Sequence, residues 1–203
     1  MLLKDVFAFG EVSLINEGRN SNKPPRFRGV FSEAERPNGN QRIYSNTLLK
    51  REVTKLQGQV NERRLLGELD HPSDEVVHLG NVSHIITKLY MDDNFVMGEG
   101  EVLNTPSGKV LTELLKAGVK LGISSRGTGS VDLDEAGSNY VVGENYNMIT
   151  FDMVSEPSSQ DAYMALAENK KLQEARAPIV AELEHHHNDR YYITALKRKL
   201  GKI

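Results

Sequence analysis

The chain has 203 residues, of which 38% are hydrophobic and 26% are charged, and its formal net charge is −3. This composition is typical of one globular domain with a tail, and it provides no general attraction to nucleic acid or to an anionic membrane. The absence of cysteine excludes disulfides, thiol catalysis and cysteine-ligated zinc. No apolar run is long enough to span a bilayer, so we expect a soluble, intracellular protein.

The first third of the chain is predicted to form strands and one helix. Residues 2–15 alternate like a strand, residues 27–31 form a second strand-like run, and residues 37–40 are dense in turn formers. Ser45 or Asn46 can cap the helix that follows. Its apolar side chains recur at spacings of three and four residues: Leu48, Leu49, Val53, Leu56 and Val60.

The middle of the chain predicts a hairpin, a helix and a strand. Two strands and the turn between them are expected at residues 76–90, 95–103 and 92–94. Thr105 and Pro106 begin a helix, and Gly118 suits its end. Residues 119–123 alternate as a strand that leads directly to Ser124. The end of a rigid strand is a common location for catalytic groups.

The last part of the chain changes character. Further strands are expected at residues 128–133, 140–142 and 146–154. A helix is expected at residues 160–172 and a linker at 175–178. Three histidines at 185–187 are followed by five positive charges, interleaved with apolar side chains: Arg190, Lys197, Arg198, Lys199 and Lys202. We interpret this segment as an amphipathic basic tail, either a solvated helix or a docking segment for an acidic partner.

Two short segments contain residues suited to nucleophilic catalysis. His71 lies in the segment GELDHP, residues 67–72, and Ser124 lies in GISSRG, residues 122–127. A serine hydroxyl is a weak nucleophile until an imidazole within hydrogen-bond reach takes its proton. The sequence alone does not require the two segments to meet.

Four blocks in this order resemble a known family: RPNGNQRIY at residues 36–44, GELDHP at 67–72, GISSRG at 122–127 and FDMVSEPS at 151–158. The chain resembles the prohead core proteases of tailed myophages, which belong to the herpesvirus assemblin-like clan of serine proteases. This resemblance implies an α+β fold with a compact, mostly antiparallel β-barrel and surrounding helices. It implies a protease domain at residues 1–174 and a flexible basic tail at residues 175–203.

The resemblance also implies an activity. We expect a serine endopeptidase that cleaves phage scaffold, core and capsid proteins inside the assembling prohead, in the host cytoplasm. No cofactor, metal, nucleic acid or membrane partner is expected, and a homo-oligomer stays open. Two other functions compete with this one. The chain could be a catalytically inactive head-core or scaffold component of the same fold, or an unrelated interaction domain in which the basic tail is the working part.

The family's motifs assign roles to particular residues. The resemblance implies that Ser124 is the nucleophile and His71 the general base. Ser125 is the competing nucleophile, because neighbouring side chains on an extended segment point to opposite faces. Arg126 is the candidate to stabilise the oxyanion, in a loop of residues 126–129 where Gly127 would help to present backbone N–H groups. The alternative is an ordinary glycine turn with a solvated arginine.

A third group is needed to orient the imidazole. Herpesvirus relatives use a second histidine, but the histidines after Ser124 lie only in the tail at residues 185–187. Asp152 matches a family block and would be costly to bury without a partner, so we favour it. Its alternative interpretation is an edge-strand aspartate that faces water. Asp70 and Glu68 are nearer to His71 in the sequence.

Other chemistries are weaker fits. Lys116 or Lys120 could act as the base of a serine–lysine pair, although nothing in the sequence places either amine near the hydroxyl. Three histidines and two aspartates at residues 70–84 match no common zinc spacing, so no metal site is predicted.

The resemblance also suggests self-cleavage. The phage family cuts after glutamate, with an aliphatic residue two positions before it. This chain has such segments ending at Glu174 and Glu168. Our hypothesis is that cleavage after Glu174 removes the tail, which would make the full chain a precursor.

Overall fold

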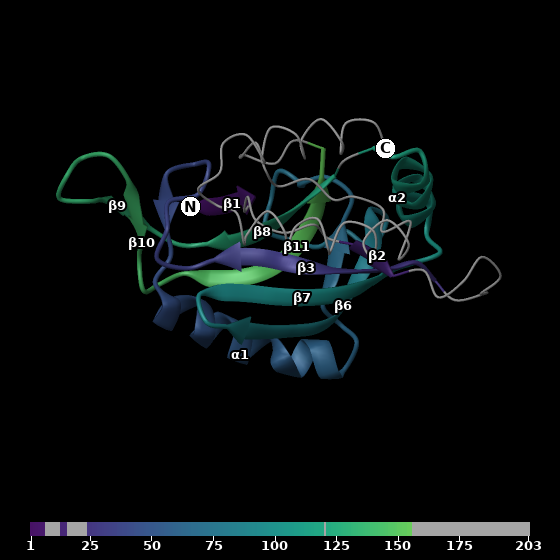
Figure 1. The fold of residues 1–203 in the computed structure, drawn as a ribbon, viewed down its shortest axis with the longest axis horizontal. Coiled ribbons are helices and arrows are strands. Elements are labelled where there is room, and N and C mark those ends of the chain that lie inside the picture. The colour runs from purple at the N-terminus through teal and green to yellow at the C-terminus, as the bar shows by residue number, and fades with distance from the viewer. Residues whose placement is uncertain (7–12, 16–23, 120, 156–203) are drawn as a thin grey trace, which may run out of the picture. The chain divides into compact units, whose positions relative to one another are not determined.

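The computed structural model describes residues 1–6, 13–15, 24–119 and 121–155 (Figure 1). Within these residues the chain forms two helices and eleven strands. In chain order the elements are β1 (Leu2–Val6), β2 (Ser13–Ile15), β3 (Arg26–Glu33), β4 (Arg42–Ile43), α1 (Asn46–Asn61), β5 (Leu66–Glu68), β6 (Val82–Asp92), β7 (Phe95–Val102), α2 (Pro106–Lys116), β8 (Gly122–Thr128), β9 (Val131–Leu133), β10 (Tyr140–Val142) and β11 (Asn147–Val154). The expected helix at 160–172, the linker, the domain boundary after Glu174 and the basic tail lie outside the described residues.

The described strands form three sheets. The largest is antiparallel throughout and has the strand order β2-β3-β7-β6-β5. A second antiparallel sheet has the order β1-β8-β11, and a small third sheet has the order β4-β10-β9, in which β4 and β10 run parallel. The predicted α+β class and the predominance of antiparallel pairing are therefore confirmed.

The closed barrel that we expected is not found among the described residues. β2 and β5 end the large sheet, and β1 and β11 end the sheet around β8. An isolated parallel bridge joins Leu69, just after β5, to Met153 in β11, and the Asp70 N–H donates to the Met153 carbonyl at 2.7 Å. An isolated bridge does not extend the ladder. The two sheets stay separate, but the segment that follows β5 is fastened to β11.

The two helices predicted within the described residues are confirmed. α1 begins after Ser45, whose hydroxyl accepts a hydrogen bond from the Leu48 N–H, and it buries the apolar face that the spacing predicted. α2 begins with the cap at Thr105 and with Pro106 in its first turn, and Gly118 follows its end with a φ of 76°. Both helices fall short of the length and apolar character that a membrane-spanning segment requires.

The hairpin of β6 and β7 is confirmed, but its first strand begins later than predicted. Residues 76–81 form a loop, and β6 starts at Val82. The loop backbone is held by side chains instead of by a neighbouring strand. The Val76 carbonyl accepts a hydrogen bond from Arg126 at 2.9 Å, and the His78 N–H donates to the Glu68 carboxylate at 2.8 Å. A pattern of β-favouring residues cannot foresee such side-chain partners.

The strand around Ser124 also differs from the prediction. β8 runs from Gly122 to Thr128, so Ser124 lies within a strand and not where a strand ends. Both edges of this strand are paired, Val6 of β1 lying opposite Ser124 on one side and Asp152 of β11 on the other. The expected loop at residues 126–129 is therefore strand as far as Thr128.

Aromatic and aliphatic side chains from the large sheet, from the sheet around β8 and from both helices form the core. The rings of Phe31 in β3 and Phe151 in β11 lie 5.1 Å apart between centroids, and both side chains are fully buried. Burial of such rings is the main favourable contribution to folding. The core therefore fixes the position of β11 against the large sheet.

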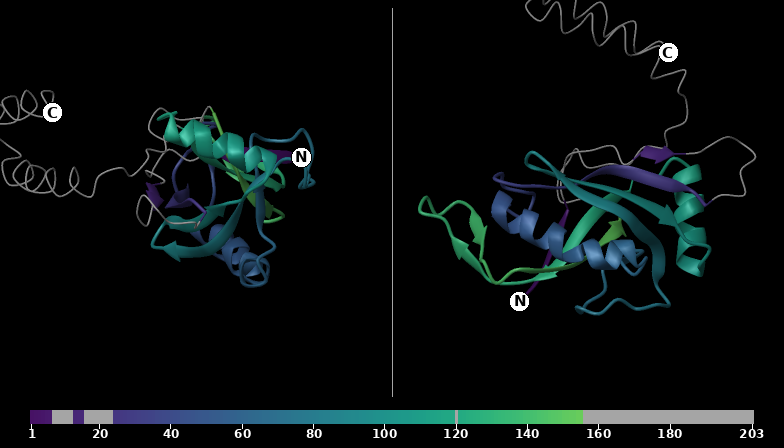
Figure 2. Two further views of the ribbon diagram at one scale, coloured as in Figure 1. Left: turned by 90° about the vertical axis from the view of Figure 1, so that its right-hand side faces the viewer. Right: turned by 90° about the horizontal axis from the view of Figure 1, so that it is seen from below.

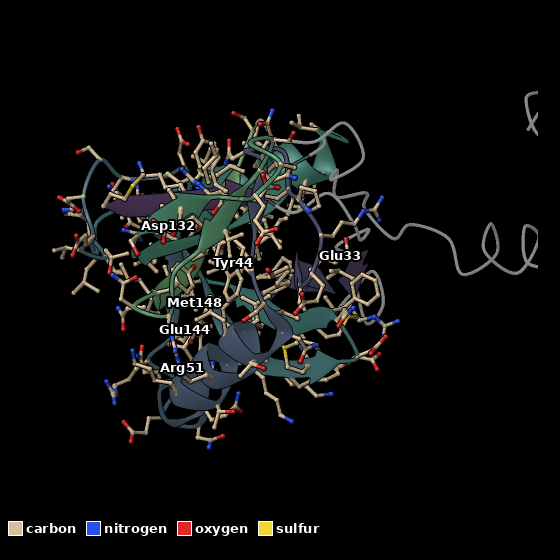
Figure 3. All side chains as sticks on the ribbon, turned by 90° about the vertical axis from the view of Figure 1, so that its left-hand side faces the viewer. Glu33, Tyr44, Arg51, Asp132, Glu144 and Met148 are labelled. Atoms are coloured by element: carbon tan, nitrogen blue, oxygen red, sulfur yellow. The ribbon has the colours of Figure 1, made fainter. Side chains whose placement is uncertain are left out.

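Helix α1 lies along the large sheet in Figures 1 and 2 and also binds the segment before β11. Arg51 donates to a Glu144 carboxylate oxygen at 3.1 Å and to the Tyr146 carbonyl at 2.9 Å. Figure 3 shows Arg51 beside Glu144, with the buried Tyr44 and Met148 nearer the middle of the molecule. β10 pairs with β4, and the turn between β9 and β10 projects away from the other described elements in Figure 1.

Candidate active site

Three side chains from three parts of the chain form a continuous hydrogen-bonded row. His71 Nε2 lies 2.5 Å from Ser124 Oγ, and His71 Nδ1 lies 2.7 Å from Asp152 Oδ2. Ser124 comes from β8, Asp152 from β11, and His71 from the loop after β5. The structure thus brings together the serine, the histidine and the carboxylate that the sequence singled out.

The sheet register explains why these groups meet. Asp152 is paired with Ser124 across β11 and β8, which places their side chains on the same face of the sheet. His71 is brought to this face by the fastening of Leu69 and Asp70 to Met153.

Asp70 makes the turn that aims His71. Its φ is 68°, in the left-handed region that aspartate tolerates better than most residues, and its carboxylate accepts the His71 N–H at 2.9 Å. Asp70 therefore shapes the backbone and does not bind the imidazole. The carboxylate that contacts the imidazole is that of Asp152, at 2.7 Å from His71 Nδ1.

The surroundings of Asp152 determine which protons the row carries. Burial would raise its pKa, but hydrogen bonds from His71 and from the Glu68 N–H, together with the charge of Arg126, hold the pKa of this carboxyl below its usual value. An ionised carboxylate can only accept, so His71 Nδ1 must donate to Asp152. In the neutral imidazole, Nε2 is then left to accept the hydroxyl proton of Ser124.

Ser125 points to the opposite side of β8. Its hydroxyl is buried and donates to the Asp5 carbonyl of β1 at 3.2 Å. The Asp5 carboxylate in turn accepts from Arg42 Nη1 at 2.8 Å and Asn40 Nδ2 at 2.7 Å, and also from the Tyr44 hydroxyl. The described contacts of Ser125 are therefore structural, and it does not contact His71.

Arg126 is fully buried behind Asp152. Its Nε donates to Asp152 Oδ2 at 2.8 Å, and its Nη2 donates to Asp152 Oδ1 and Glu68 Oε1, both at 3.2 Å. Its Nη1 donates to the carbonyls of Val76 at 2.9 Å and Asp74 at 3.3 Å. These five bonds match the five N–H donors of a guanidinium, so the alternative of a solvated arginine is wrong.

Gly127 meets a different requirement from the one expected. It lies inside β8 and has no positive φ, so it forms no turn. A Cβ atom at this position would lie 2.6 Å from the ring of Tyr146. Glycine is needed here for the close approach of that ring, and this close approach could not be read from the sequence.

Glu68 is the main component that sequence reasoning underrated. Its side chain is 1% exposed and accepts hydrogen bonds from Arg126 and from the His78 N–H, while its own N–H donates to Asp152 Oδ1 at 3.0 Å. The only signal was its place in the GELDHP block. That signal showed that Glu68 is near His71 in the sequence, but it did not show which groups would form hydrogen bonds with Glu68.

Among the described residues, no arrangement of side chains fits a serine–lysine pair or a metal site. Lys116 pairs with Glu113 on α2 at 2.8 Å, and Lys120 lies outside the described residues. His84 is buried, and its Nε2 lies 3.1 Å from the Phe151 carbonyl, whereas His78 lies on the loop. In the described part of the chain, no three metal-binding side chains gather in one place.

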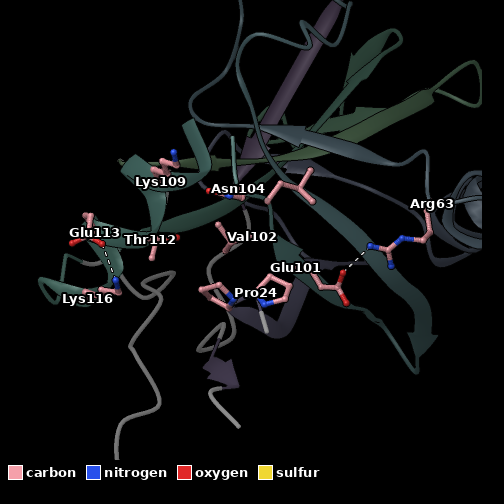
Figure 4. Close-up of a pocket in the computed structure, with 11 residues that line it drawn as sticks. Pro24, Arg63, Glu101, Val102, Asn104, Lys109, Thr112, Glu113 and Lys116 are labelled. Atoms are coloured by element: carbon pink, nitrogen blue, oxygen red, sulfur yellow. Dashed lines mark hydrogen bonds and ion pairs between the residues drawn. The ribbon is translucent and has the colours of Figure 1, made fainter. Parts of the chain in front are cut away.

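A pocket of about 590 Å³ lies away from this row of residues (Figure 4). It is formed by α2, the end of β7 and Pro24 and Pro25, and two ion pairs cross its wall, Arg63 with Glu101 and Lys116 with Glu113. None of the three hydrogen-bonded residues lines it. This pocket is therefore separate from the candidate site.

Comparison with known proteins identifies the class. The sequence profile of the prohead core protein serine protease family matches residues 12–175, and the chain belongs to this family. It is therefore a protease of the prohead core type.

A sequence comparison and a structure comparison both match the chain to a protease of phage T4. The chain is 32% identical over 159 residues to the prohead core protein protease of Enterobacteria phage T4, an alignment that covers 76% of this chain and 74% of the relative. Its fold is similar to the solved structure of the bacteriophage T4 capsid assembly protease, gp21, with a TM-score of 0.68 and 27% identity. That match covers 75% of this chain and 96% of the solved one.

Proposed function

We propose that the chain is a serine endopeptidase of capsid assembly, which cleaves scaffold, core and capsid proteins inside the assembling prohead. The observation that supports this most directly is the row from Ser124 through His71 to Asp152. The distances are 2.5 Å from Ser124 Oγ to His71 Nε2 and 2.7 Å from His71 Nδ1 to Asp152 Oδ2. A nucleophile, a base and an orienting carboxylate within hydrogen-bond reach are the parts that acyl transfer requires. The names of the T4 relatives support the setting in capsid assembly.

The first half of the reaction forms an acyl-enzyme. Ser124 Oγ attacks the carbonyl carbon of the scissile peptide bond while His71 Nε2 takes the hydroxyl proton, and the carbonyl electron pair moves onto oxygen. Asp152 stabilises the resulting imidazolium through its bond to Nδ1. The tetrahedral intermediate then collapses. The C–N bond breaks, and His71 returns the proton to the leaving amine.

The second half releases the product. A water molecule gives its proton to His71 as its oxygen attacks the acyl carbon, and the bond to Ser124 Oγ breaks as the proton returns to that oxygen. The serine is restored and the new carboxyl group leaves.

We assign Arg126 to positioning Asp152, in place of the oxyanion role that the resemblance implied. All five of its N–H donors are engaged within the buried cluster, so no donor is left for a developing oxyanion. The bidentate contact with Asp152 fixes the plane of the carboxylate that faces the imidazole.

The test compares four forms of the full chain on synthetic peptides spanning Glu174 and Glu168. We expect the wild type to cut, and Ser124→Ala and His71→Ala to lose at least about 10³-fold in kcat. Ser125→Ala is the matched control and should keep most of the activity, because its hydroxyl bonds to the Asp5 carbonyl.

Two results would overturn the proposal. Loss of activity in Ser125→Ala alone would reverse the assignment of the nucleophile. An inactive wild type, on these peptides and on purified capsid and scaffold proteins, would favour the catalytically inactive head-core component of the same fold.

A further inference from the structure

A second buried carboxylate lies behind the one that binds His71. Glu68 is 1% exposed and Arg126 is 0% exposed, and the guanidinium lies between the Glu68 and Asp152 carboxylates. The Arg126 contacts are 3.2 Å to Glu68 and 2.8 Å to Asp152. Arg126 therefore links the two carboxylates in one buried charge cluster.

The charges in this cluster do not balance. One guanidinium faces two carboxylates, so the three side chains carry one net negative charge when both acids are ionised. An uncompensated buried charge is costly, and a positive charge placed beside the cluster lowers that cost. A proton on His71, which contacts Asp152, provides that charge.

We propose that Glu68 is a positioning residue that sets the basicity of His71 from behind, by offsetting the charge of Arg126. This inference rests on the proposed function, because basicity matters only if His71 acts as the base. With Glu68 ionised, the cluster of Glu68, Arg126 and Asp152 has a net charge of −1. When His71 takes the proton of Ser124, the cluster and the imidazolium together have no net charge. Without the Glu68 charge, Arg126 would cancel Asp152 and the imidazolium would lose its counter-charge.

Other charged and titratable groups also surround His71, and a test of Glu68 must leave them unchanged. On the described elements around His71, the charged and titratable side chains are Lys4, Glu68, Asp70, Asp74, His78, His84, Arg126 and Asp152. The substitution Glu68→Gln changes only one of them. Glutamine has the same shape, and its carbonyl oxygen can still accept from Arg126 and from the His78 N–H.

The experiment follows the ring nitrogens of His71 by NMR against pH, in full-length protein. Compared with wild type, Glu68→Gln should lower the midpoint of the His71 titration, because the substitution removes a buried negative charge that favours the imidazolium. Arg126→Gln removes the opposite charge and should raise the midpoint. Glu68→Asp, which keeps the negative charge, should bring the midpoint back towards wild type.

Glu52→Gln is the matched control. Glu52 is also a buried glutamate that accepts from an arginine, Arg51 at 2.9 Å, and from a backbone N–H of β11, that of Met148 at 2.8 Å. It has no described contact with the row of site residues. Glu52→Gln should leave the His71 midpoint unchanged even if it destabilises the fold as much as Glu68→Gln does.

The rate of peptide cutting provides the second measurement. The acid limb of the pH–rate profile should move in the same direction as the His71 midpoint in each variant. Midpoints that do not change in Glu68→Gln and Arg126→Gln would overturn this inference while leaving the protease proposal intact. An inactive wild type would overturn the protease proposal, and the NMR midpoints would still report whether Glu68 acts on His71.

Discussion

Ser124 and Ser83 each lie beside a histidine, but the two histidines have different partners. Ser83 Oγ lies 2.9 Å from His84 Nδ1, a distance comparable to that between Ser124 and His71. The other nitrogen of His84 faces the Phe151 carbonyl, whereas His71 faces the Asp152 carboxylate. A neutral carbonyl gives an imidazolium much less stabilisation than a carboxylate does. The carboxylate therefore distinguishes the proposed site from the structural pair.

His84 leads to a prediction about acid stability. Burial lowers the pKa of His84 to about 4, against the partial opposition of Asp152 and the Phe151 carbonyl. Between pH 6.5 and about 4 the unfolded chain takes up a proton that the native chain refuses, so stability falls as the pH falls. The loss from this residue should reach about 3 kcal/mol at pH 4. Urea unfolding at several pH values measures it.

The comparison with His84→Gln isolates this contribution. The variant should be less stable than wild type at pH 7 but should lose about 3 kcal/mol less between pH 6.5 and 4. His78→Gln is the control, because the His78 side chain is 44% exposed. Equal pH slopes in wild type and His84→Gln would show that His84 is not held neutral by the fold.

At the residue scale, the sequence singled out three side chains that lie together in the structure, but it did not indicate their other contacts. Ser124, His71 and Asp152 could be selected because each lies in a block typical of one family. The sequence indicated that Arg126 lies near the site, but it did not indicate which groups Arg126 would bind. Its partners include the carbonyls of Asp74 and Val76, and no sequence pattern foretells that a loop will fold over a guanidinium.

At the scale of elements, β1 supports the strand that carries Ser124. It pairs with β8 along its whole length, and its Asp5 side chain is fully buried against Arg42, Tyr44 and Asn40. The block at residues 36–44 thus has a structural task, because three of its side chains bind the carboxylate of β1. The side of β8 opposite to Ser124 is fixed in this way.

We therefore predict that Asp5→Ala destabilises the protein by about 2 to 4 kcal/mol. This lies slightly below the range for enclosed ion pairs, because the Arg42 side chain remains 18% exposed. Faster amide hydrogen exchange should accompany the loss in β1 and β8, since the carboxylate joins β1 to the segment before α1. Urea unfolding and hydrogen exchange test this together.

The control for Asp5 is Asp132→Ala. Asp132 is exposed on β9, and its removal should change stability by no more than about 0.5 kcal/mol. An equal, small effect of both substitutions would contradict the supporting role of Asp5.

Helices were predicted more successfully than strands, for a local reason. The caps Ser45 and Thr105 and the apolar faces of α1 and α2 are properties of contiguous sequence. Whether residues 76–81 form a strand depends on a partner strand elsewhere, and side chains of Arg126 and Glu68 bind that backbone instead. The same dependence on distant partners explains why Ser124 lies inside β8.

At the scale of the whole molecule, the candidate site lies where two separate sheets are fastened together. His71 follows β5, an edge strand of the large sheet, whereas Ser124 and Asp152 belong to the sheet around β8. The bridge between Leu69 and Met153 joins them. A closed barrel was expected from the resemblance, but strand pairing over long sequence separations cannot be derived from the residues of one chain.

The tail leads to the last prediction, which concerns the full chain. If the protease accepts segments like its own at Glu174, wild type should lose residues 175–203 on incubation, and intact mass spectrometry should detect the shorter chain. Ser124→Ala should keep its full mass, because the nucleophile is absent. Glu174→Gln should keep the tail or shift the cut to Glu168. The double variant Glu168→Gln/Glu174→Gln should be cut at neither residue. An unprocessed wild type that still cuts added peptides would show that the tail is not a substrate, and loss of the tail in Ser124→Ala would assign its removal to another protease.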